Sequence, residues 1–261
     1  MLRYIDAELR KLVSLRAMFV AAGICVVAAP ALAVLNAGSI RARLDAGDTS
    51  SLADWPTSQA GSEVGLLAAV AAVVLGVFAI SSEYAAGASE VGGGRQIVTS
   101  LTCVPRRGLL FAAKAIALAV VTAPLAGFGI AAGIAAAQLR LGEYGNSARQ
   151  LADALGWRPL GAVVYCVCTA LLALAITTIT RNGLIPLVVL IINSSVVSVS
   201  ILLSRLTPLA KFLPDAAGLQ LFAYNAAIED PLSPAMGGVV LAVWTAAALL
   251  AGATVLVRRD A

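Results

Sequence analysis

Few residues of this 261-residue chain could take part in chemistry. There is no histidine, and the four cysteines lack metal-ligand spacing, because Cys25, Cys166 and Cys168 lie inside apolar runs while Cys103 lies in a polar segment. General acid–base and metal catalysis need histidines, carboxylates or thiolates that are brought together. The sequence therefore predicts no catalytic residue, no metal site and no cofactor, and it favours the cysteines as small buried apolar side chains.

A second kind of chemistry, ATP hydrolysis, needs a phosphate-binding loop of the form G-x-x-x-x-G-K-[ST]. The glycine-rich stretch Gly92-Gly93-Gly94-Arg95 lacks the lysine and the hydroxyl residue of that loop. The apolar runs also contain no carboxylate of the kind that proton- or sodium-driven transport commonly uses. If the chain takes part in transport, we expect its energy to come from another polypeptide.

One apolar run contains a cluster of polar residues that could face a transported molecule. Asn193, Ser194, Ser195, Ser198 and Ser200 fall within about two helical turns of one another. Such side chains line a substrate path in some membrane proteins and hydrogen-bond neighbouring helices in others. The sequence leaves both roles open for Asn193, Ser194, Ser198 and Ser200 and favours helix packing.

These residues must be positioned by helices in a membrane, because the composition does not suit a soluble fold. Hydrophobic residues make up 60% of the chain and charged residues 12%, against about 25% charged in a typical soluble domain. The mean hydropathy is +0.93. The basic pI of about 9.1 does not indicate nucleic-acid binding, because the Lys and Arg residues are spread between the apolar runs.

The positions of the charges predict an all-α polytopic membrane protein with six transmembrane helices in a single domain, residues 1–261. About 20 apolar residues cross a bilayer as a helix, and lipid offers the backbone no other partner. The predicted spans are residues 17–37, 64–82, 111–138, 158–180, 183–203 and 237–257. Within the third, Gly129-x-x-x-Gly133 predicts a close helix–helix contact.

The distribution of basic residues predicts the orientation. With the N-terminus in the cytoplasm, 11 of the 18 Lys and Arg residues lie inside and 7 outside, which favours both termini cytoplasmic in a bacterial plasma membrane. Residues 1–16 are predicted to form an amphipathic helix at the inner surface, with a solvated tail as the alternative. A signal peptide cleaved near Ala31-Leu32-Ala33 is disfavoured, because Asp6 and Glu8 precede a long apolar run.

Two connections between the spans have distinct patterns. On the inside, residues 95–102 are predicted to form a short helix that follows the Gly92–Gly94 hinge and ends before Pro105. On the outside, residues 205–234 contain four prolines and apolar pieces that are too short to cross. We expect this outer segment, which precedes the last span, to form short helices that enter the outer leaflet without crossing it. A plain surface loop is the alternative.

The ordered features resemble the permease subunit of type-2 ATP-binding-cassette (ABC) exporters over essentially the whole chain. The residues that carry the resemblance are Glu83-Tyr84, Gly87, residues 97–101, Pro105-Arg106-Arg107, Lys114, and residues 211–215, which resemble the start of the family's outer helical hairpin. The glycine-rich insert before Arg95 departs from the family pattern.

The resemblance implies that the short inside helix is a coupling helix that docks on a separate ATPase subunit. It assigns ATPase coupling to Glu83, Arg95, Gln96, Ser100, Leu101, Pro105, Arg106 and Arg107. For Arg106 and Arg107 the alternative is contact with lipid phosphate, and for Glu83 a solvated helix-end carboxylate. The implied partners are the ATPase, a second permease subunit in a homo- or heterodimer, and the lipid membrane, with no nucleic acid.

The function expected from this resemblance is ATP-driven export of a drug, an antibiotic, a peptide or a lipid-like molecule. The alternatives are a secondary transporter or a non-transporting membrane subunit, such as a sensor or an immunity component. An intramembrane enzyme is disfavoured, because the apolar runs contain no ionisable pair for acid–base chemistry.

Overall fold

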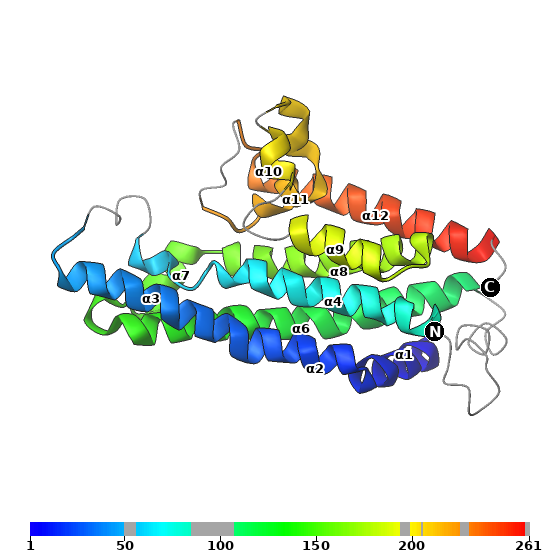
Figure 1. The fold of residues 1–261 in the computed structure, drawn as a ribbon, viewed down its shortest axis with the longest axis horizontal. Coiled ribbons are helices and arrows are strands. Elements are labelled where there is room, and N and C mark those ends of the chain that lie inside the picture. The colour runs from blue at the N-terminus through cyan, green and yellow to red at the C-terminus, as the bar shows by residue number, and fades with distance from the viewer. Residues whose placement is uncertain (50–55, 85–106, 194–198, 205, 225–229, 259–261) are drawn as a thin grey trace.

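The computed structural model describes residues 1–49, 56–84, 107–193, 199–204, 206–224 and 230–258 (Figure 1). Over these ranges the regular structure is helical and no strand is present. Five helical stretches are long and apolar enough to cross a membrane, namely Arg16–Asp45, Thr57–Ser82, Arg107–Tyr144, Arg158–Thr180 and Pro234–Arg258. The expected all-helical fold of membrane type is confirmed at this level.

The long elements are connected by short helices. The long helices and the N-terminal helix are α1 (Leu2–Ser14), α2 (Arg16–Gly23), the π-helical turn η1 (Ile24–Ala28), α3 (Ala29–Asp45), α4 (Val64–Tyr84), α6 (Arg107–Leu141), α8 (Arg158–Thr180) and α12 (Pro234–Arg258). The short ones are η3 (Thr57–Gln59), η4 (Gly142–Tyr144), α7 (Ala148–Leu155), α9 (Leu184–Asn193), α10 (Val199–Ser204), η5 (Pro208–Phe212) and α11 (Pro214–Leu219).

The first long stretch extends beyond the predicted span 17–37. Arg41 and Arg43, which lie beyond that predicted span, belong to α3, which ends at Asp45. A charge-free window predicts where lipid ends, whereas a helix continues as long as its residues favour it, and Ala, Leu and Arg are strong helix formers. For the same reason α6 begins at Arg107 and ends at Leu141, outside the predicted limits 111 and 138.

The predicted span 183–203 is not confirmed as one helix. The structure describes α9 and α10 on either side of residues 194–198, which lie outside the described residues. α9 packs against α4 and α8, whereas α10 packs mainly against η5. Residues 206–224 thus contain two short helices, η5 and α11, before α12, and their depth in a membrane remains a prediction.

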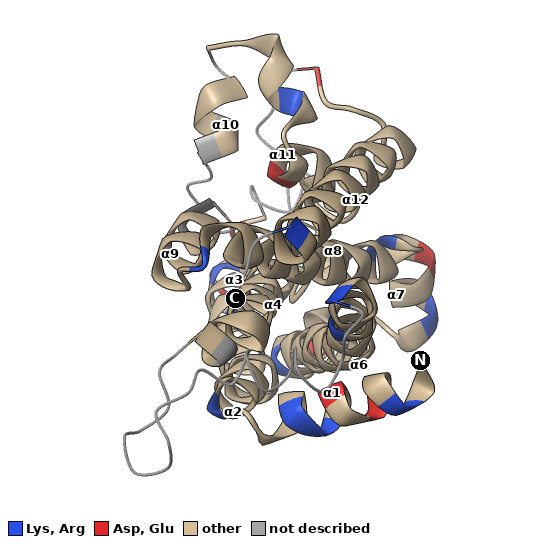
Figure 2. Ribbon diagram, turned by 90° about the vertical axis from the view of Figure 1, so that its right-hand side faces the viewer, with Lys and Arg blue, Asp and Glu red and all other residues tan. Residues whose placement is uncertain are grey.

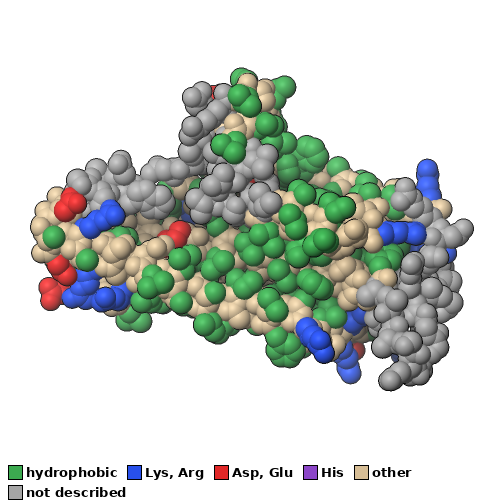
Figure 3. Space-filling view, in the orientation of Figure 1, with side chains coloured by type: hydrophobic (Ala, Val, Ile, Leu, Met, Phe, Trp, Pro, Cys, Tyr) green, Lys and Arg blue, Asp and Glu red, His purple; other side chains and the backbone are tan. Residues whose placement is uncertain are grey.

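The bundle has α4 and α8 at its centre. α4 packs against α8 and α6, and α8 also packs against α12. Most residues in the apolar parts of α4 and α8 are buried, whereas only 22% are buried in those of the first stretch and of α12. Figure 3 shows apolar side chains over the middle of the molecule and charged side chains gathered toward its two ends, as expected for a chain surrounded by lipid.

Both chain ends lie at the same end of the bundle, together with the end of α4 and the beginning of α6 (Figure 1). We call this end the N/C end. Figure 2, which faces it, shows α1 lying across the axes of the long helices. The corner is made at Leu15, which is extended (φ −69°, ψ 140°) between α1 and α2. α1 is the helix that the amphipathic pattern predicted, although its position at a membrane surface remains a prediction.

Glycines permit the closest helix contacts. A Cβ atom on Gly76 of α4 would lie 2.2 Å from the carbonyl oxygen of Ala170 in α8. The predicted motif in α6 behaves in the same way: Gly129 faces Cys25 of η1, and Gly133 faces Val64 of α4. The close helix–helix contact predicted for Gly129-x-x-x-Gly133 is therefore confirmed.

Candidate functional site

The predicted coupling residues fall at the N/C end, but most of them are outside the described residues. Arg95, Gln96, Ser100, Leu101, Pro105 and Arg106 belong to residues 85–106, of which nothing structural is described. Glu83 lies in the last turn of α4, with its side chain not described, and Arg107 is the half-buried first residue of α6. The structure therefore places the two helices that the predicted coupling segment connects, and not the segment itself.

A buried ion pair joins α1 to α6 beside that connection. The Nζ atom of Lys114 lies 2.6 Å from the Oε2 atom of Glu8, to which it donates a hydrogen bond. Glu8 is 7% exposed and Lys114 is 2% exposed. The sequence singled out Lys114 as part of the inner-loop pattern, but it gave no sign that Glu8 was its partner, because 106 positions separate the two residues.

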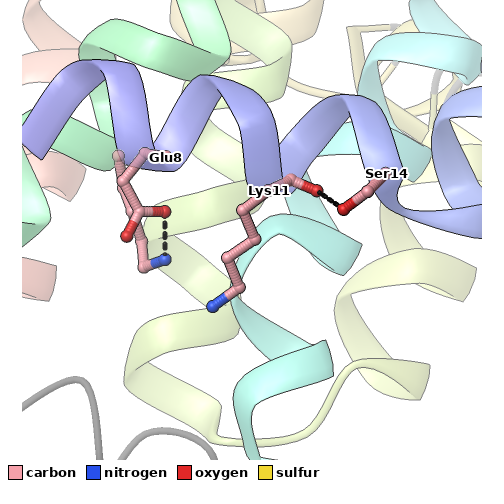
Figure 4. Close-up of polar contacts among 4 residues, drawn as sticks. Glu8, Lys11 and Ser14 are labelled. Atoms are coloured by element: carbon pink, nitrogen blue, oxygen red, sulfur yellow. Dashed lines mark hydrogen bonds and ion pairs between the residues drawn. The ribbon is translucent and has the colours of Figure 1, made fainter.

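The helix α1 has a buried side and an exposed side, and this arrangement brings Glu8 to α6. Leu12 is buried, with Leu9 packed against the same core, while Asp6 and Arg10 form an exposed i,i+4 pair at 3.1 Å. In Figure 4, Glu8 and Lys11 point to the same side of α1, and the Ser14 hydroxyl donates a 2.8 Å hydrogen bond to the carbonyl oxygen of Lys11. The charged part of Glu8 thus reaches under the helix toward α6.

Burial makes the Glu8–Lys114 pair sensitive to the loss of either partner. Desolvation of two charges offsets most of their attraction, so the intact pair adds little net stability. Removing one partner leaves a buried charge uncompensated, at a cost of about 3–5 kcal/mol. The pair therefore contributes more to the position and orientation of α1 on α6 than to the net stability of the bundle.

The turn from α8 to α9 also lies at the N/C end, where it contacts the end of α4. Arg181 adopts the left-handed conformation (φ 53°), and its guanidinium carbon lies 6.0 Å from the ring centroid of Tyr84. Gly183 is tight against Ser81, because a Cβ on Gly183 would lie 2.9 Å from the Cβ of Ser81. The end of α4 thus lies against the α8–α9 turn, while α1 lies against α6.

The polar cluster predicted in residues 193–200 is only partly described. Asn193 is the last residue of α9, with its side chain not described, and Ser194 and Ser198 lie outside the described residues. Ser200 is buried in α10. Whether these residues line a path or pack helices stays a prediction.

One buried polar contact was missed by sequence reasoning, which noted Asp215 only within residues 211–215 of the resemblance. The Tyr165 hydroxyl of α8 donates a hydrogen bond to the Oδ1 atom of Asp215 in α11. Asp215 is 5% exposed and Tyr165 is 1% exposed. The available signal was Pro214, which favours the first position of a helix and so places Asp215 in its first turn, with apolar residues after it.

Further polar contacts surround α11. The Trp244 Nε1 atom of α12 donates a 2.8 Å hydrogen bond to the carbonyl oxygen of Phe212. Arg158 donates to the carbonyl oxygen of Ala223 at 2.8 Å and lies 3.8 Å from the ring centroid of Tyr224. These contacts hold residues 208–224 against α8 and α12.

The described part of the chain contains no group of three or more Cys, Asp or Glu residues that could hold a metal ion. Cys25 and Cys166 are buried free thiols, as the sequence predicted for small apolar side chains, and Cys168 is a half-buried one. Comparison with known proteins gives no match to a family model, a curated protein or a solved structure. The arrangement of the chain's own residues is therefore what supports a function.

Proposed function

We propose that this chain is the permease subunit of a type-2 ABC exporter in a bacterial plasma membrane. It forms the substrate path with a second permease subunit and takes its energy from a separate ATPase subunit that docks on residues 85–106. The observation that carries the proposal is the buried Glu8–Lys114 pair, which fixes α1 to the part of α6 that directly follows the predicted coupling segment.

The arrangement of the N/C end suits transmission of movement. Lys114 lies seven residues after the first residue of α6, about 10 Å along the helix axis. A displacement of the segment before Arg107 would move this part of α6, and the ion pair would carry α1 with it. The α8–α9 turn lies against the end of α4, so it would follow the same displacement.

The distribution of charges supports the proposed orientation. The N/C end contains α1, Arg107, Arg181 and Arg258, and the excess of Lys and Arg in these segments favours the cytoplasm. α1, with its apolar face on the bundle and its charged face outward, fits the headgroup region of the inner leaflet. The cargo is an amphipathic molecule such as a drug, an antibiotic, a peptide or a lipid.

The proposal is tested by crosslinking from defined positions. A photo-crosslinking amino acid replaces Arg107 at the N/C end in one variant and Arg149, exposed on α7 at the opposite end, in a control variant. We expect Arg107 to crosslink to an ATPase subunit, identified by its phosphate-binding loop, in native membranes, and Arg149 not to do so. Crosslinking from neither position, with the chain isolated alone, would overturn the proposal.

One observation favours a secondary transporter as a second candidate. The charge-free spans predicted no carboxylate at bilayer depth, yet Asp215 is buried against Tyr165, seven residues or about 10 Å along α8 from Arg158. Intramembrane carboxylates commonly serve ion-coupled transport. In proteoliposomes, transport that follows an ion gradient without ATP would favour this candidate, and transport that requires ATP and an ATPase would exclude it.

A further inference from the structure

An apolar groove lies on the surface of the bundle between the beginning of α8 and the beginning of α12. Its volume is about 700 Å³, within the range of about 300–1,000 Å³ that is typical of small-molecule sites. Trp157 lines it on the α8 side. The residues of α12 that line it recur at the spacing of one helix face and include Ala235, Gly238, Val239 and Ala242.

Two glycines shape the walls of this groove. A Cβ atom on Gly238 would lie 3.1 Å from the Cδ2 atom of Leu221, which follows α11 and also lines the groove. A Cβ atom on Gly161 of α8 would lie 2.9 Å from the Cζ3 atom of Trp157. The two flanking side chains therefore pack against positions that have no side chain, and this packing holds the walls in place.

The described residues that line the groove include no charged side chain. Ser233 supplies a hydroxyl at its edge, and the oxygen of that hydroxyl accepts a 3.4 Å hydrogen bond from the backbone N–H of Met236. The charged residues that flank the lining in sequence are Arg158, next to Trp157, and Asp230, before Ser233. An occupant of the groove is therefore apolar along most of its contact, with polar groups near one end only.

The groove has the depth of one membrane leaflet. The 25 residues of α12 rise about 37 Å, enough to cross a hydrocarbon core of about 30 Å. Because Arg258 lies at the N/C end, Pro234 lies near the opposite boundary of that core. From Pro234 to Ala242 the helix rises about 12 Å, close to the thickness of one leaflet, about 15 Å. Trp157 then lies at the membrane boundary, where tryptophan is enriched.

A lipid chain fits this groove better than a second protein chain does. Eight residues line the groove, whereas a stable protein interface involves about 20–30 residues a side. Within a bilayer no hydrophobic driving force favours association, so an occupant is retained by its van der Waals contacts. A flexible acyl chain in a groove has partner atoms on several sides, whereas on a convex helix surface it has them on one.

We propose that this groove binds one acyl chain of a phospholipid from the leaflet opposite the N/C end. The ester end of the chain lies beside Trp157, and the methyl end points past Ala242 toward the bilayer centre. The lipid covers the contact between α12 and the segment that follows α11. The groove requires that the chain lies in a membrane and does not require an ATPase partner, so this lipid site and the proposed export function can fail separately.

The first test locates the acyl chain on the full-length wild-type protein. The protein is reconstituted in phosphatidylethanolamine–phosphatidylglycerol vesicles that contain a phospholipid with a diazirine near the middle of one acyl chain. It is then washed in detergent, so that loosely held lipid exchanges, and irradiated. We expect the label to concentrate on Val239 and Ala242.

The internal control of this test is Leu250, which lies outside the groove on the same helix and is 68% exposed, against 55% for Val239. Unselective lipid contact would label Leu250 at least as strongly as Val239. Labelling of Val239 and Ala242 that is no stronger than that of Leu250, or no labelling at all, would overturn the proposal.

The second test counts the lipids that stay on the purified protein, by mass spectrometry of the intact protein in detergent. We expect one phospholipid per wild-type chain. Ala242→Phe fills the groove, and we expect the affinity for that phospholipid to fall by about tenfold. Ala247→Phe is the matched control, because Ala247 is exposed on the same helix and does not line the groove. Full retention in Ala242→Phe, or an equal loss in both variants, contradicts the site.

A third measurement tests whether a protein chain occupies the groove instead. A photo-crosslinking amino acid replaces Ala242, and the full-length chain is irradiated in its native membrane. We expect adducts with phospholipid. A crosslink to a second copy of the chain would show that the groove is a protein interface and would overturn the lipid assignment.

Discussion

Two short helices that are not long enough to cross a membrane are attached to the bundle at different places, and each is held by a buried carboxylate. At the N/C end, α1 is held to α6 by Glu8 and Lys114, two opposite charges at 2.6 Å. In the outer segment, α11 is held to α8 by Asp215, which accepts a hydrogen bond from the neutral Tyr165 hydroxyl. A charge pair is intolerant of losing one member, whereas a contact to a neutral group loses less. We therefore expect the loss of Lys114 to weaken the attachment of α1 more than the loss of the Tyr165 hydroxyl weakens that of α11.

The largest effect is expected from breaking the charge pair. Lys114→Met leaves Glu8 buried without its ammonium partner, and we expect the free energy of unfolding to fall by about 3–5 kcal/mol. The loss is measured by denaturant unfolding in detergent, and faster proteolysis near Leu15 would report the release of α1.

The control is the double variant Glu8→Leu/Lys114→Met, in which both charges of the pair are removed. Replacing a buried pair by apolar side chains is often neutral or stabilising, so we expect its stability to return close to that of the wild type. A double variant as unstable as Lys114→Met would show that the pair is not what holds α1.

A smaller effect is expected from the corresponding change in the outer segment. Tyr165→Phe removes the hydroxyl that donates to Asp215, and the expected loss of stability is about 1–3 kcal/mol. Tyr224→Phe is the matched control, because its hydroxyl makes only an exposed 3.4 Å contact with the carbonyl oxygen of Ala154. A loss in Tyr165→Phe equal to that in Lys114→Met would remove the distinction between the two attachments.

The smallest effect is expected from the exposed contact between Lys211 and Asp230 in the same outer segment. The hydrogen bond from Lys211 and its charge lower the pKa of Asp230 below its ordinary value of 3.8. The contact therefore contributes fully above about pH 4 and fades as the pH falls through the lowered pKa of the folded state. Comparing Asp230→Asn with wild type at pH 7 and pH 3, we expect a small difference at pH 7 that shrinks at pH 3 and in high salt.

The sequence predicted the long apolar helices best, because their location depends on one physical rule, the cost of a charge in lipid. The cost of a charge in lipid locates the long helices, so the apolar runs around Val73, Ala126 and Leu174 are all found inside described helices. The same rule does not locate helix ends in water, which is why α3 continues through Arg41 and Arg43 beyond the predicted limit at residue 37. The rule also predicted one span over residues 183–203, of which the structure describes α9 and α10 and leaves residues 194–198 outside the described residues.

The tertiary polar contacts were less accessible to sequence reasoning. Glu8 was recognised as a residue of an amphipathic helix and Lys114 as one at a helix beginning, but their pairing depends on how α1 crosses α6. Asp215 was placed in residues 205–234, for which short helices were preferred and a surface loop was the alternative, and it is buried where α11 packs on α8 and α12. Such contacts are set by three-dimensional packing between distant positions, which residue periodicity does not encode.

The notch that Gly76 makes in the surface of α4 limits how this protein can move. It receives the carbonyl oxygen of Ala170, and the side chains one turn to either side, Val73 and Ile80, are both buried. Sliding α4 along α8 like a piston would drive that oxygen into one of these side chains. The two central helices are therefore expected to move as one rigid unit. A conformational change then has to be a tilting of the peripheral helices around that unit.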